Sequence, residues 1–347
     1  MSKELVRIAA GIDGGCNNIK IYFGNNEKLI TRSTASTKPT VAAHLGMAEE
    51  LDEIVLKING KTYAVGPKVN DPLDTRFNGY HVSELNLALV CAALVRSKLD
   101  LKNTVIDACF GLPLHRFYKT DGTPRADLIE QRIEAWRRPV EVVKGKKKFP
   151  KDGIFGDLSG AAEGVGAYLD YRLDEEGNIL NEPEGLTVVV DVGGSTTDIA
   201  IIEDGNVLFS GLSTSIESGA LHLYQRVAEL TQQHLDLRIA PSIVKIEDCI
   251  RNHSCNFKSG NISENIRHIV AQERSAVAEE IALTVEQRLT KRLDEVSRIL
   301  YVGGGAELLG DELKDRKLGS ARAIVPEDPQ MANARGFYKF AVLQQHS

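Results

Sequence analysis

Two short turns in this chain carry the residue types that bind phosphate and magnesium. The first runs from Asp13 to Asn18 and the second from Asp191 to Thr196, each with two consecutive glycines. Glycines permit positive φ and let backbone N–H groups approach phosphate oxygens, while hydroxyl and amide side chains add hydrogen bonds. Asp13 and Asp191 each end a strand, where they could hold a hydrated magnesium ion, because that ion prefers oxygen ligands. The pair of turns therefore predicts two related half-molecules that face one nucleotide.

The segment after each turn distinguishes these turns from the commoner phosphate-binding loops. A Walker loop or a dinucleotide-binding fingerprint leads from a strand into a helix. Here apolar residues alternate with other residues at strand spacing, at 19 to 23 and again at 199 to 201. Each turn is therefore predicted to close a β-hairpin. One such hairpin would be weak evidence, since Gly-rich turns join many ordinary strands, but two with matching chemistry are much stronger.

A third glycine-rich segment follows a strand that begins at 298. Gly303, Gly304 and Gly305 stand between this strand and an expected helix. A side chain at these positions would obstruct a flat base or a ribose, so the glycines predict close approach of a nucleoside. In isolation, these glycines would be explained by a crowded strand-to-helix turn. Because the same chain also contains the two hairpins, we favour a role in binding a nucleoside.

Length, charge and cysteine content limit the class of protein. With 347 residues and 42% hydrophobic content, the chain is expected to form two domains with substantial cores. The net charge of -6 argues against a broad basic surface for direct nucleic-acid binding. No apolar run has membrane-spanning length and the first twenty residues are unlike a signal peptide, so we expect a cytoplasmic protein without membrane contact. The five cysteines form no CxxC pair, which indicates reduced thiols and no zinc site.

The remaining segments are predicted to form strands and covering helices. A polar stretch at 174 to 185 is interpreted as a flexible linker at a domain boundary, and the basic run at 144 to 148 as a solvated turn. The other predicted elements are a hairpin at 54 to 65, a strand at 104 to 113, and helices after Ser83, at 125 to 138, 161 to 171, 219 to 236 and about 262 to 296.

In chain order, the three glycine-rich segments resemble the phosphate-1, phosphate-2 and adenosine motifs of the actin, heat-shock chaperone and sugar kinase superfamily. They lie at 13 to 20, 191 to 198 and 302 to 308. Within this superfamily the chain resembles ParM/StbA, the plasmid-segregating bacterial actins. The narrower likeness rests on three further segments, at 110 to 118, 162 to 168 and 333 to 339.

The resemblance implies an α/β actin-like fold of two duplicated ribonuclease H-like lobes with a central nucleotide cleft. The first lobe is expected at 1–172, completed by a C-terminal helix at 328–347, and the second at 173–327. The implied ligands are ATP or ADP and Mg²⁺, and the implied activity is an ATPase whose hydrolysis drives the turnover of a homopolymer filament. The implied role is segregation of plasmid DNA, reached through a DNA-binding adaptor protein.

The resemblance also assigns roles to residues. Glu163 matches the acidic residue that helps to position the attacking water, and a carboxylate there could orient a water and accept its proton. Asp191 is the second catalytic candidate, and Gly219 lies where the family approaches the ribose and base. The other nucleotide-binding candidates are Asp13, Gly14, Gly15, Cys16, Asn17, Asn18 and Lys20 in the first motif, Gly193, Gly194, Ser195 and Thr196 in the second, and Gly303, Gly304, Gly305 and Ala306 in the third. Asp13 and Asp191 are expected to hold the metal through water.

Two residues depart from the family pattern. Cys16 stands where relatives commonly carry a hydroxyl, which weakens one expected phosphate hydrogen bond because a thiol is a poor donor. Ala162 replaces a proline often found before the catalytic acid, which removes a restraint on φ.

Two other functions share this fold, so the fold alone does not decide between them. A small-molecule kinase would need an acceptor site with an aspartate base, and we find no convincing motif for one. A non-hydrolysing nucleotide-binding scaffold would differ mainly at Glu163.

Overall fold

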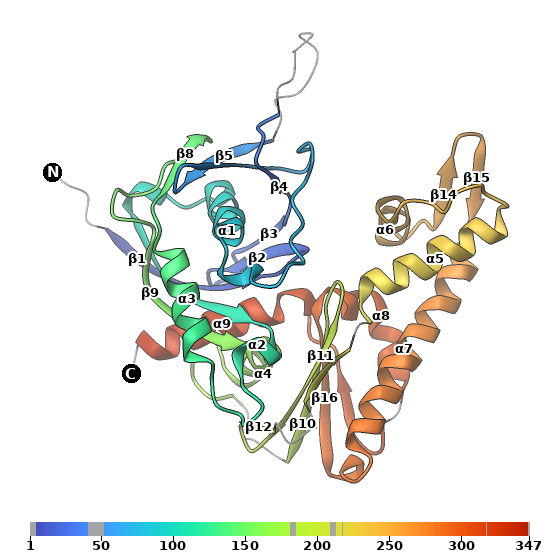
Figure 1. The fold of residues 1–347 in the computed structure, drawn as a ribbon. Coiled ribbons are helices and arrows are strands. Elements are labelled where there is room, and N and C mark those ends of the chain that lie inside the picture. The colour runs from blue at the N-terminus through green and yellow to red at the C-terminus, as the bar shows by residue number, and fades with distance from the viewer. Residues whose placement is uncertain are drawn as a thin grey trace. The chain divides into compact units, whose positions relative to one another are not determined.

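The computed structural model describes residues 5–40, 52–180, 185–208, 213–216, 218–316 and 318–345. The chain forms two compact units (Figure 1). The first comprises Met1–Lys119, Thr123–Glu182 and Asn333–Ser347, and the second comprises Thr120–Gly122 and Pro183–Ala332.

Residues 174 to 180 of the segment predicted as a flexible linker lie in the first unit. An antiparallel bridge joins Leu173 to Ile179, and Tyr22 Oη donates a 2.8 Å hydrogen bond to Glu175 Oε1. The carboxylate of Asp174 also accepts hydrogen bonds from two amides of this turn. These contacts hold residues 173 to 180 against the first unit, so this part is an ordered turn; residues 181–184 of the predicted linker lie outside the described part.

The main sheet of the first unit has five strands in the order β3-β2-β1-β7-β9. β1 pairs antiparallel with β2 and parallel with β7, so the predicted first hairpin is confirmed. The strands are β1 Val6–Gly14, β2 Asn18–Tyr22, β3 Lys28–Arg32, β7 Thr104–Leu112 and β9 Phe155–Ala162.

A second sheet of the first unit has the order β4-β6-β5-β8. Asn59 and Gly60, both at positive φ, form the tight turn of the predicted hairpin at 54 to 65, which is confirmed. The strands are β4 Ala35–Ser36, β5 Ile54–Ile58, β6 Lys61–Val65 and β8 Val140–Lys144. The basic run after β8 is not simply a solvated turn, because half-buried Lys147 donates to the carbonyls of Ser97 and Leu99.

The helices of the first unit cover these sheets. Ser83 caps α1 by accepting a hydrogen bond from the Asn86 amide, as predicted, and α1 packs on β5 and β6 (Figure 1). The helices are η1 Tyr80–Val82, α1 Glu84–Arg96, η2 Leu101–Asn103, α2 Leu114–Phe117, α3 Ala126–Trp136, α4 Val165–Arg172 and α9 Ala332–Gln345. The helix predicted at 161 to 171 is wrong at its start, because residues 161 and 162 continue β9 beside β7.

The main sheet of the second unit repeats the order of the first, as β12-β11-β10-β16-β17, with β13 also paired to β11. β10 is antiparallel to β11 and parallel to β16, which matches the pairing of β1 with β2 and β7. The predicted duplication is therefore present in the strand order. The strands are β10 Leu186–Val192, β11 Thr197–Glu203, β12 Asn206–Val207, β13 Thr214–Ile216, β16 Val296–Val302 and β17 Arg322–Ile324.

Helices of the second unit cover this sheet and extend beyond it. α8 packs on β10 and β16, while α5 packs on α6 and α7 (Figure 1). The elements are α5 Ala220–His234, α6 Ile243–Arg251, β14 Asn256–Ser259, β15 Ile262–Asn265, α7 Arg267–Leu289, η3 Leu293–Glu295, α8 Gly303–Asp315 and η4 Pro329–Met331. The single helix predicted at about 262 to 296 is too long, because its first residues pair as β15 with β14 and its last residues form η3 and the start of β16.

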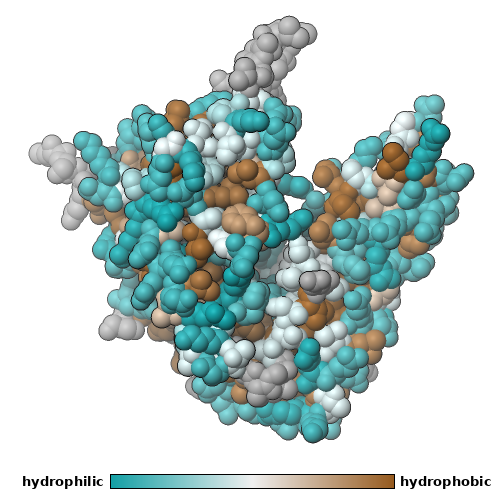
Figure 2. All heavy atoms as spheres, in the orientation of Figure 1, coloured by the Kyte–Doolittle hydropathy of each residue, from teal (hydrophilic) through white to brown (hydrophobic). Residues whose placement is uncertain are grey.

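Hydrophilic residues dominate the surface shown in Figure 2 on both units. Within the described residues, no helix is long and apolar enough to cross a membrane. The apolar side chains instead form cores, and one core in the second unit joins β10, β11 and β16 to α5, α7 and α8.

α9 docks on the first unit through glycines. A Cβ atom at Gly336 would overlap the Gly166 carbonyl oxygen, and one at Gly11 would overlap the Ala334 carbonyl oxygen. Arg335 and Lys339 of the same helix reach the buried Asp170 carboxylate on α4, at 2.7 and 2.8 Å. The absence of side chains at the glycines therefore sets how closely α9 approaches β1 and α4.

We expect Gly336→Ala to lower the free energy of unfolding by about 3 kcal/mol, because its methyl group would overpack against backbone that has no room to move. In an exposed helix the same change would stabilise the protein by about 1 kcal/mol. Urea unfolding followed by circular dichroism measures the difference. The control is Gly310→Ala on α8, whose Cβ would lie 3.5 Å from Val325 in ordinary contact; equal stability of the two variants would contradict the packing argument.

Candidate phosphate-binding turns

The first turn joins β1 to β2 and is anchored by its carbonyl groups. All four carbonyl oxygens from residue 14 to 17 accept hydrogen bonds from the body of the first unit. The donors are Asn86 Nδ2 on Gly14 (3.0 Å), Ser33 Oγ and Tyr80 Oη on Gly15 (2.7 and 3.1 Å), Thr75 Oγ1 on Cys16 (2.7 Å) and the Ser33 amide on Asn17 (2.9 Å). Because the C=O and N–H of a trans peptide point in opposite directions, the N–H groups of Gly15, Cys16 and Asn17 face the other side. Successive N–H groups in such a turn form an anion-binding concavity.

The second turn joins β10 to β11 and is anchored in a similar way. The carbonyls of Gly193 and Gly194 accept hydrogen bonds from the first two amides of α5, at 3.0 and 2.8 Å, and the Gly193 amide donates to the Thr196 carbonyl at 2.8 Å. Ser195 and Thr196 are exposed. The N–H groups opposite the anchored carbonyls, those of Gly194 and Ser195, are therefore the candidate phosphate donors.

The glycines of the two turns serve close packing and not positive φ, which corrects the sequence argument. Gly14, Gly15, Gly193 and Gly194 are absent from the residues at positive φ. A Cβ at Gly14 would lie 2.7 Å from Arg132 Nη2, and one at Gly193 would lie 2.9 Å from the Thr196 carbonyl oxygen. At Gly14 and Gly193 a side chain would therefore come too close to neighbouring atoms.

Gly219 has a similar function at the start of α5. A Cβ there would lie 2.8 Å from the Gly193 carbonyl oxygen and 2.9 Å from that of Gly194. Gly219 thus lets α5 approach the second turn and donate its first amides to it. The structure places this predicted ribose and base candidate directly beside the phosphate-2 motif.

Asp13 and Lys20 face each other across the first hairpin. They are paired in the register of β1 and β2, and Lys20 Nζ lies 2.8 Å from Asp13 Oδ2. Both side chains are largely buried, with exposed fractions of 15% for Lys20 and 6% for Asp13. Lys20, which the resemblance assigns to the phosphate-1 motif, therefore forms an ion pair with Asp13, the carboxylate predicted to hold the metal.

Cys16 is half-buried and remains a neutral thiol. Burial, followed by the negative charge of Glu163, raises the pKa of Cys16 to about 11. A neutral thiol in the turn does not repel a phosphate. The departure from a hydroxyl therefore changes hydrogen-bond strength and leaves the charge of the turn unaltered.

Glu163 lies between β9 and α4, in the same unit as the first turn. Its amide donates a 2.8 Å hydrogen bond to the Leu112 carbonyl at the end of β7, and Gly164 follows at a φ of 79°. The chain therefore turns sharply after β9, and Glu163 stands in this turn instead of on the helix predicted for it. The backbone hydrogen bond to Leu112 holds Glu163 in place without the proline that the resemblance led us to expect before it.

Two of the segments that carry the ParM resemblance meet beside Glu163. Asn333 Oδ1 accepts hydrogen bonds from the amides of Gly164 (2.9 Å) and Ala167 (3.2 Å). Asn333 is 5% exposed. This buried amide caps α4 from α9, so the segment at 333 to 339 positions the turn that holds the candidate catalytic acid.

The third glycine-rich segment forms the first turn of α8. Gly303 has a φ of 88°, and a Cβ there would overlap Asp191 Oδ1, while one at Gly305 would overlap the Val192 side chain. Only Gly304 has open space around the position of a Cβ. Ala306 is fully buried in the core. Gly303, Gly305 and Ala306 therefore pack α8 on β10, and Gly304 is the one of these four that has room for a nucleoside.

The carboxylates expected to hold magnesium lie one in each unit. Asp13 is 4% exposed and Asp191 is 7% exposed, each at the end of a strand beside an anchored turn. No group of three or more His, Cys, Asp or Glu side chains in the described ranges could hold a metal ion. A single carboxylate beside a phosphate-binding turn fits Mg²⁺, because this ion keeps several waters and takes oxygens from the phosphates.

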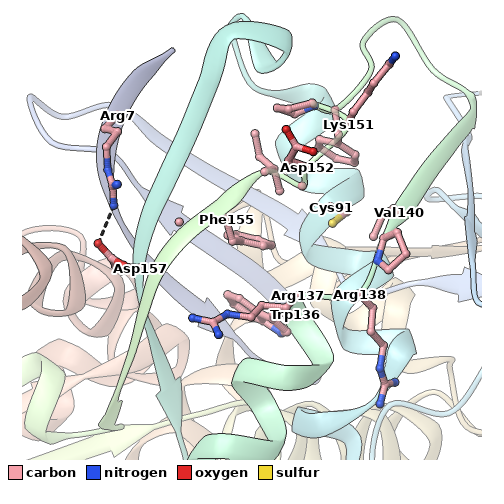
Figure 3. Close-up of a pocket in the computed structure, with 16 residues that line it drawn as sticks. Arg7, Cys91, Trp136, Arg137, Arg138, Val140, Lys151, Asp152, Phe155 and Asp157 are labelled. Carbon is pink, nitrogen blue, oxygen red and sulfur yellow. Dashed lines mark hydrogen bonds and ion pairs between the residues drawn. The ribbon is translucent and has the colours of Figure 1, made fainter.

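A cavity of about 530 Å³ lies elsewhere in the first unit (Figure 3). Trp136 and Phe155 form part of its wall and stack with their centroids 5.0 Å apart. None of the predicted site residues lines this cavity. The Arg132 guanidinium also lies over the Trp136 ring, 4.9 Å from its centroid.

Five residues of the first unit were missed by the sequence analysis although they support the first turn. Four of them anchor its carbonyls from loops and helices distant in the chain, and no local pattern marks them. The fifth, Arg132, falls on the same face of α3 as Trp136, and this basic residue on an apolar face was the available signal. The five are Ser33, Thr75, Tyr80, Asn86 and Arg132.

Two protein-family models match the segments that carry these turns. A model described as "Actin like proteins N terminal domain" matches residues 11–148, which include the first turn. A model described as "Archaeal actin homologue MreB-like, C-terminal" matches residues 189–315, which include the second turn and the start of α8. Each model matches less than half of the chain, and between them they show similarity to actin-like proteins in both units. Both glycine-rich turns lie within the segments that these models match.

Similar proteins extend over nearly the whole of this actin-like chain. It is 25% identical over 343 residues to an archaeal actin homologue from Thermoplasma acidophilum, which covers 95% of this chain and 97% of the relative. A structure of an archaeal actin homologue in complex with ADP has a TM-score of 0.73 at 22% identity, covering 97% of this chain and 99% of that one. A 15-stranded ParM filament from Clostridium botulinum has a TM-score of 0.71 at 19% identity, covering 97% and 99%. The predicted actin-like fold and the resemblance to ParM are confirmed.

Proposed function

We propose that this actin-like protein binds ATP and Mg²⁺ through its two phosphate turns, polymerises, and turns over its filaments by ATP hydrolysis. The observation that carries the proposal is the anchoring of both turns by their carbonyl groups, at Gly14 to Asn17 and at Gly193 and Gly194. Each turn thereby directs several N–H groups away from its anchored carbonyls, toward the same side, as phosphate binding requires. The relatives add that one archaeal homologue binds ADP and that a ParM assembles into a filament.

Glu163 is the proposed catalytic acid–base residue of hydrolysis. Its charge already acts on Cys16 in the first turn, where it helps to raise the thiol pKa. A carboxylate close to a phosphate turn can orient a water and accept its proton, while Mg²⁺ stabilises charge on the transferring phosphate. Asp13 and Asp191 are the proposed metal carboxylates, acting through water.

The proposed cargo is plasmid DNA, contacted through a separate DNA-binding adaptor in the cytoplasm. The support is the resemblance to ParM together with the net charge of -6, which disfavours direct binding to a polyanion. Filament formation and hydrolysis do not depend on this part of the proposal.

Purified protein is expected to sediment as filaments with ATP and Mg²⁺ and to stay in the supernatant without nucleotide. Nucleotide binding favours one conformation of the protein over others, and assembly follows from the favoured one. Sedimentation with electron microscopy measures the outcome, and EDTA added with ATP is the control. Protein that binds ATP but stays monomeric across salt and crowding conditions would contradict polymerisation, and transfer of phosphate to a sugar or acetate would identify a kinase.

A further inference from the structure

Arg132 on α3 is a fully buried arginine behind the first phosphate turn. Its side chain is 0% exposed, and Nη2 lies 2.7 Å from the position of a Cβ on Gly14. The same nitrogen donates a 3.3 Å hydrogen bond to Asn86 Oδ1, and Asn86 Nδ2 in turn donates to the Gly14 carbonyl. The guanidinium therefore supports the end of β1 both directly and through Asn86.

The hydrogen-bonding capacity of this guanidinium is mostly unused. Nε and Nη1 are buried and have no hydrogen-bond partner among the described residues. The group lies instead over two adjoining aromatic rings, 4.9 Å from the centroid of Phe110 and 4.9 Å from that of Trp136. Nη2 donates to the neutral amide of Asn86, so no carboxylate accepts a hydrogen bond from Arg132 within the described residues.

Burying this charge costs folding free energy, and that cost points to a function for the charge. Burying an unpaired cation is expensive, and an apolar side chain of similar volume would fill the same space without that penalty. Burial lowers the pKa of Arg132 to about 10, opposed mainly by the charge of Glu163, so the guanidinium stays protonated at neutral pH. Its neighbours of opposite charge are thus the candidate catalytic acid and, more weakly, Asp13.

We propose that Arg132 is a positioning residue for the nucleotide phosphates: a fixed positive charge behind the first turn that the phosphates of a bound nucleotide neutralise. This inference rests on the proposed function of the turn. The charge acts through protein and not through water, so its attraction for a phosphate on the N–H side of the turn is only weakly screened. The attraction grows with the negative charge of the ligand and does not act on an uncharged nucleoside.

The test compares binding of ATP, ADP and adenosine to wild-type protein and to Arg132→Met, by calorimetry with Mg²⁺. We expect the affinity for ATP to fall on the order of 10-fold, with a smaller loss for ADP and a change of less than about twofold for adenosine. A residue that only filled space would weaken all three ligands alike. Arg137→Met removes the same charge from the exposed end of α3 and is expected to leave the three affinities unchanged.

Two further variants separate charge from folding. Arg132→Lys keeps the charge and is expected to retain the preference for ATP over adenosine. If Arg132→Met does not fold, as judged by circular dichroism, Arg132→Gln supplies the comparison, since its amide can still donate to Asn86 while the charge is gone. An unchanged ratio of ATP to adenosine affinity in the folded uncharged variant overturns the inference. Wild-type protein that fails to bind ATP overturns the proposed function instead, so the two failures are distinct.

Discussion

Replacing Glu163 by glutamine is expected to slow ATP hydrolysis by about 10²- to 10⁴-fold, the usual contribution of a general base. Glutamine has the same size as glutamate and can still contact a water, but it does not accept the proton. The amide of residue 163 would still donate to the Leu112 carbonyl, and Asn333 would still cap α4, so the local structure is expected to persist. Phosphate release under single-turnover conditions measures the effect.

ATP binding and filament assembly are expected to be retained in Glu163→Gln, because the hydrogen bonds that anchor the carbonyl groups of the two turns come from other residues. Filaments of this variant would therefore persist longer than wild-type filaments. The matched control is Glu134→Gln, which removes an exposed carboxylate from α3 in the same unit. Hydrolysis at the wild-type rate in Glu163→Gln would remove this residue from the mechanism and favour either another base or a scaffold without turnover.

Asp191→Asn is expected to abolish most of the Mg²⁺ dependence of nucleotide affinity, with ATP binding in Mg²⁺ weakened by about 10- to 100-fold. The side chain is 7% exposed at the end of β10, beside the second turn and against Gly303. Asparagine fits the same space, so the effect isolates the carboxylate charge that attracts the hydrated ion. Titrations with ATP in Mg²⁺ and in EDTA measure the ratio of affinities.

The control for this experiment is Asp204→Asn, which removes a charge from an exposed position in the same unit. Asp204 lies at a φ of 47° in the turn between β11 and β12, a conformation that asparagine tolerates well. The nucleotide affinity of Asp204→Asn is expected to depend on Mg²⁺ as it does in the wild-type protein. A normal ratio of affinities in Asp191→Asn itself would show that the metal is held elsewhere.

The sequence predicted the hairpins well because their signals are local. Alternating apolar residues after each turn, and Asn59-Gly60 between β5 and β6, determine the strands through neighbouring side chains and turn conformation alone. The same holds for the start of α1 at Ser83, where the cap lies next to the helix that it stabilises. Residues close in the sequence determine such elements, so no contact with a distant segment is needed to predict them.

The helix boundaries failed where pairing with another strand decided the conformation. Ala161 and Ala162 suit a helix by propensity, but they extend β9 because β7 offers a parallel ladder beside them. Residues 262 to 265 differ from the predicted helix for a local reason instead, because they pair as β15 with β14 across the two-residue turn at 260 and 261. Short segments at the edge of a helical pattern thus follow strand pairing over intrinsic helix preference.

The sequence by itself determined the chemistry of this protein: two acidic, glycine-rich turns, each between strands, and their order along the chain. Only the tertiary structure decided how that chemistry is supported. It showed that the glycines make room for Arg132, Thr196 and α5, and that Asn333 on α9 holds the turn after Glu163. The physical reason is that turn composition acts over a few residues, whereas burial, close packing and hydrogen bonds between distant segments exist only once the chain has folded.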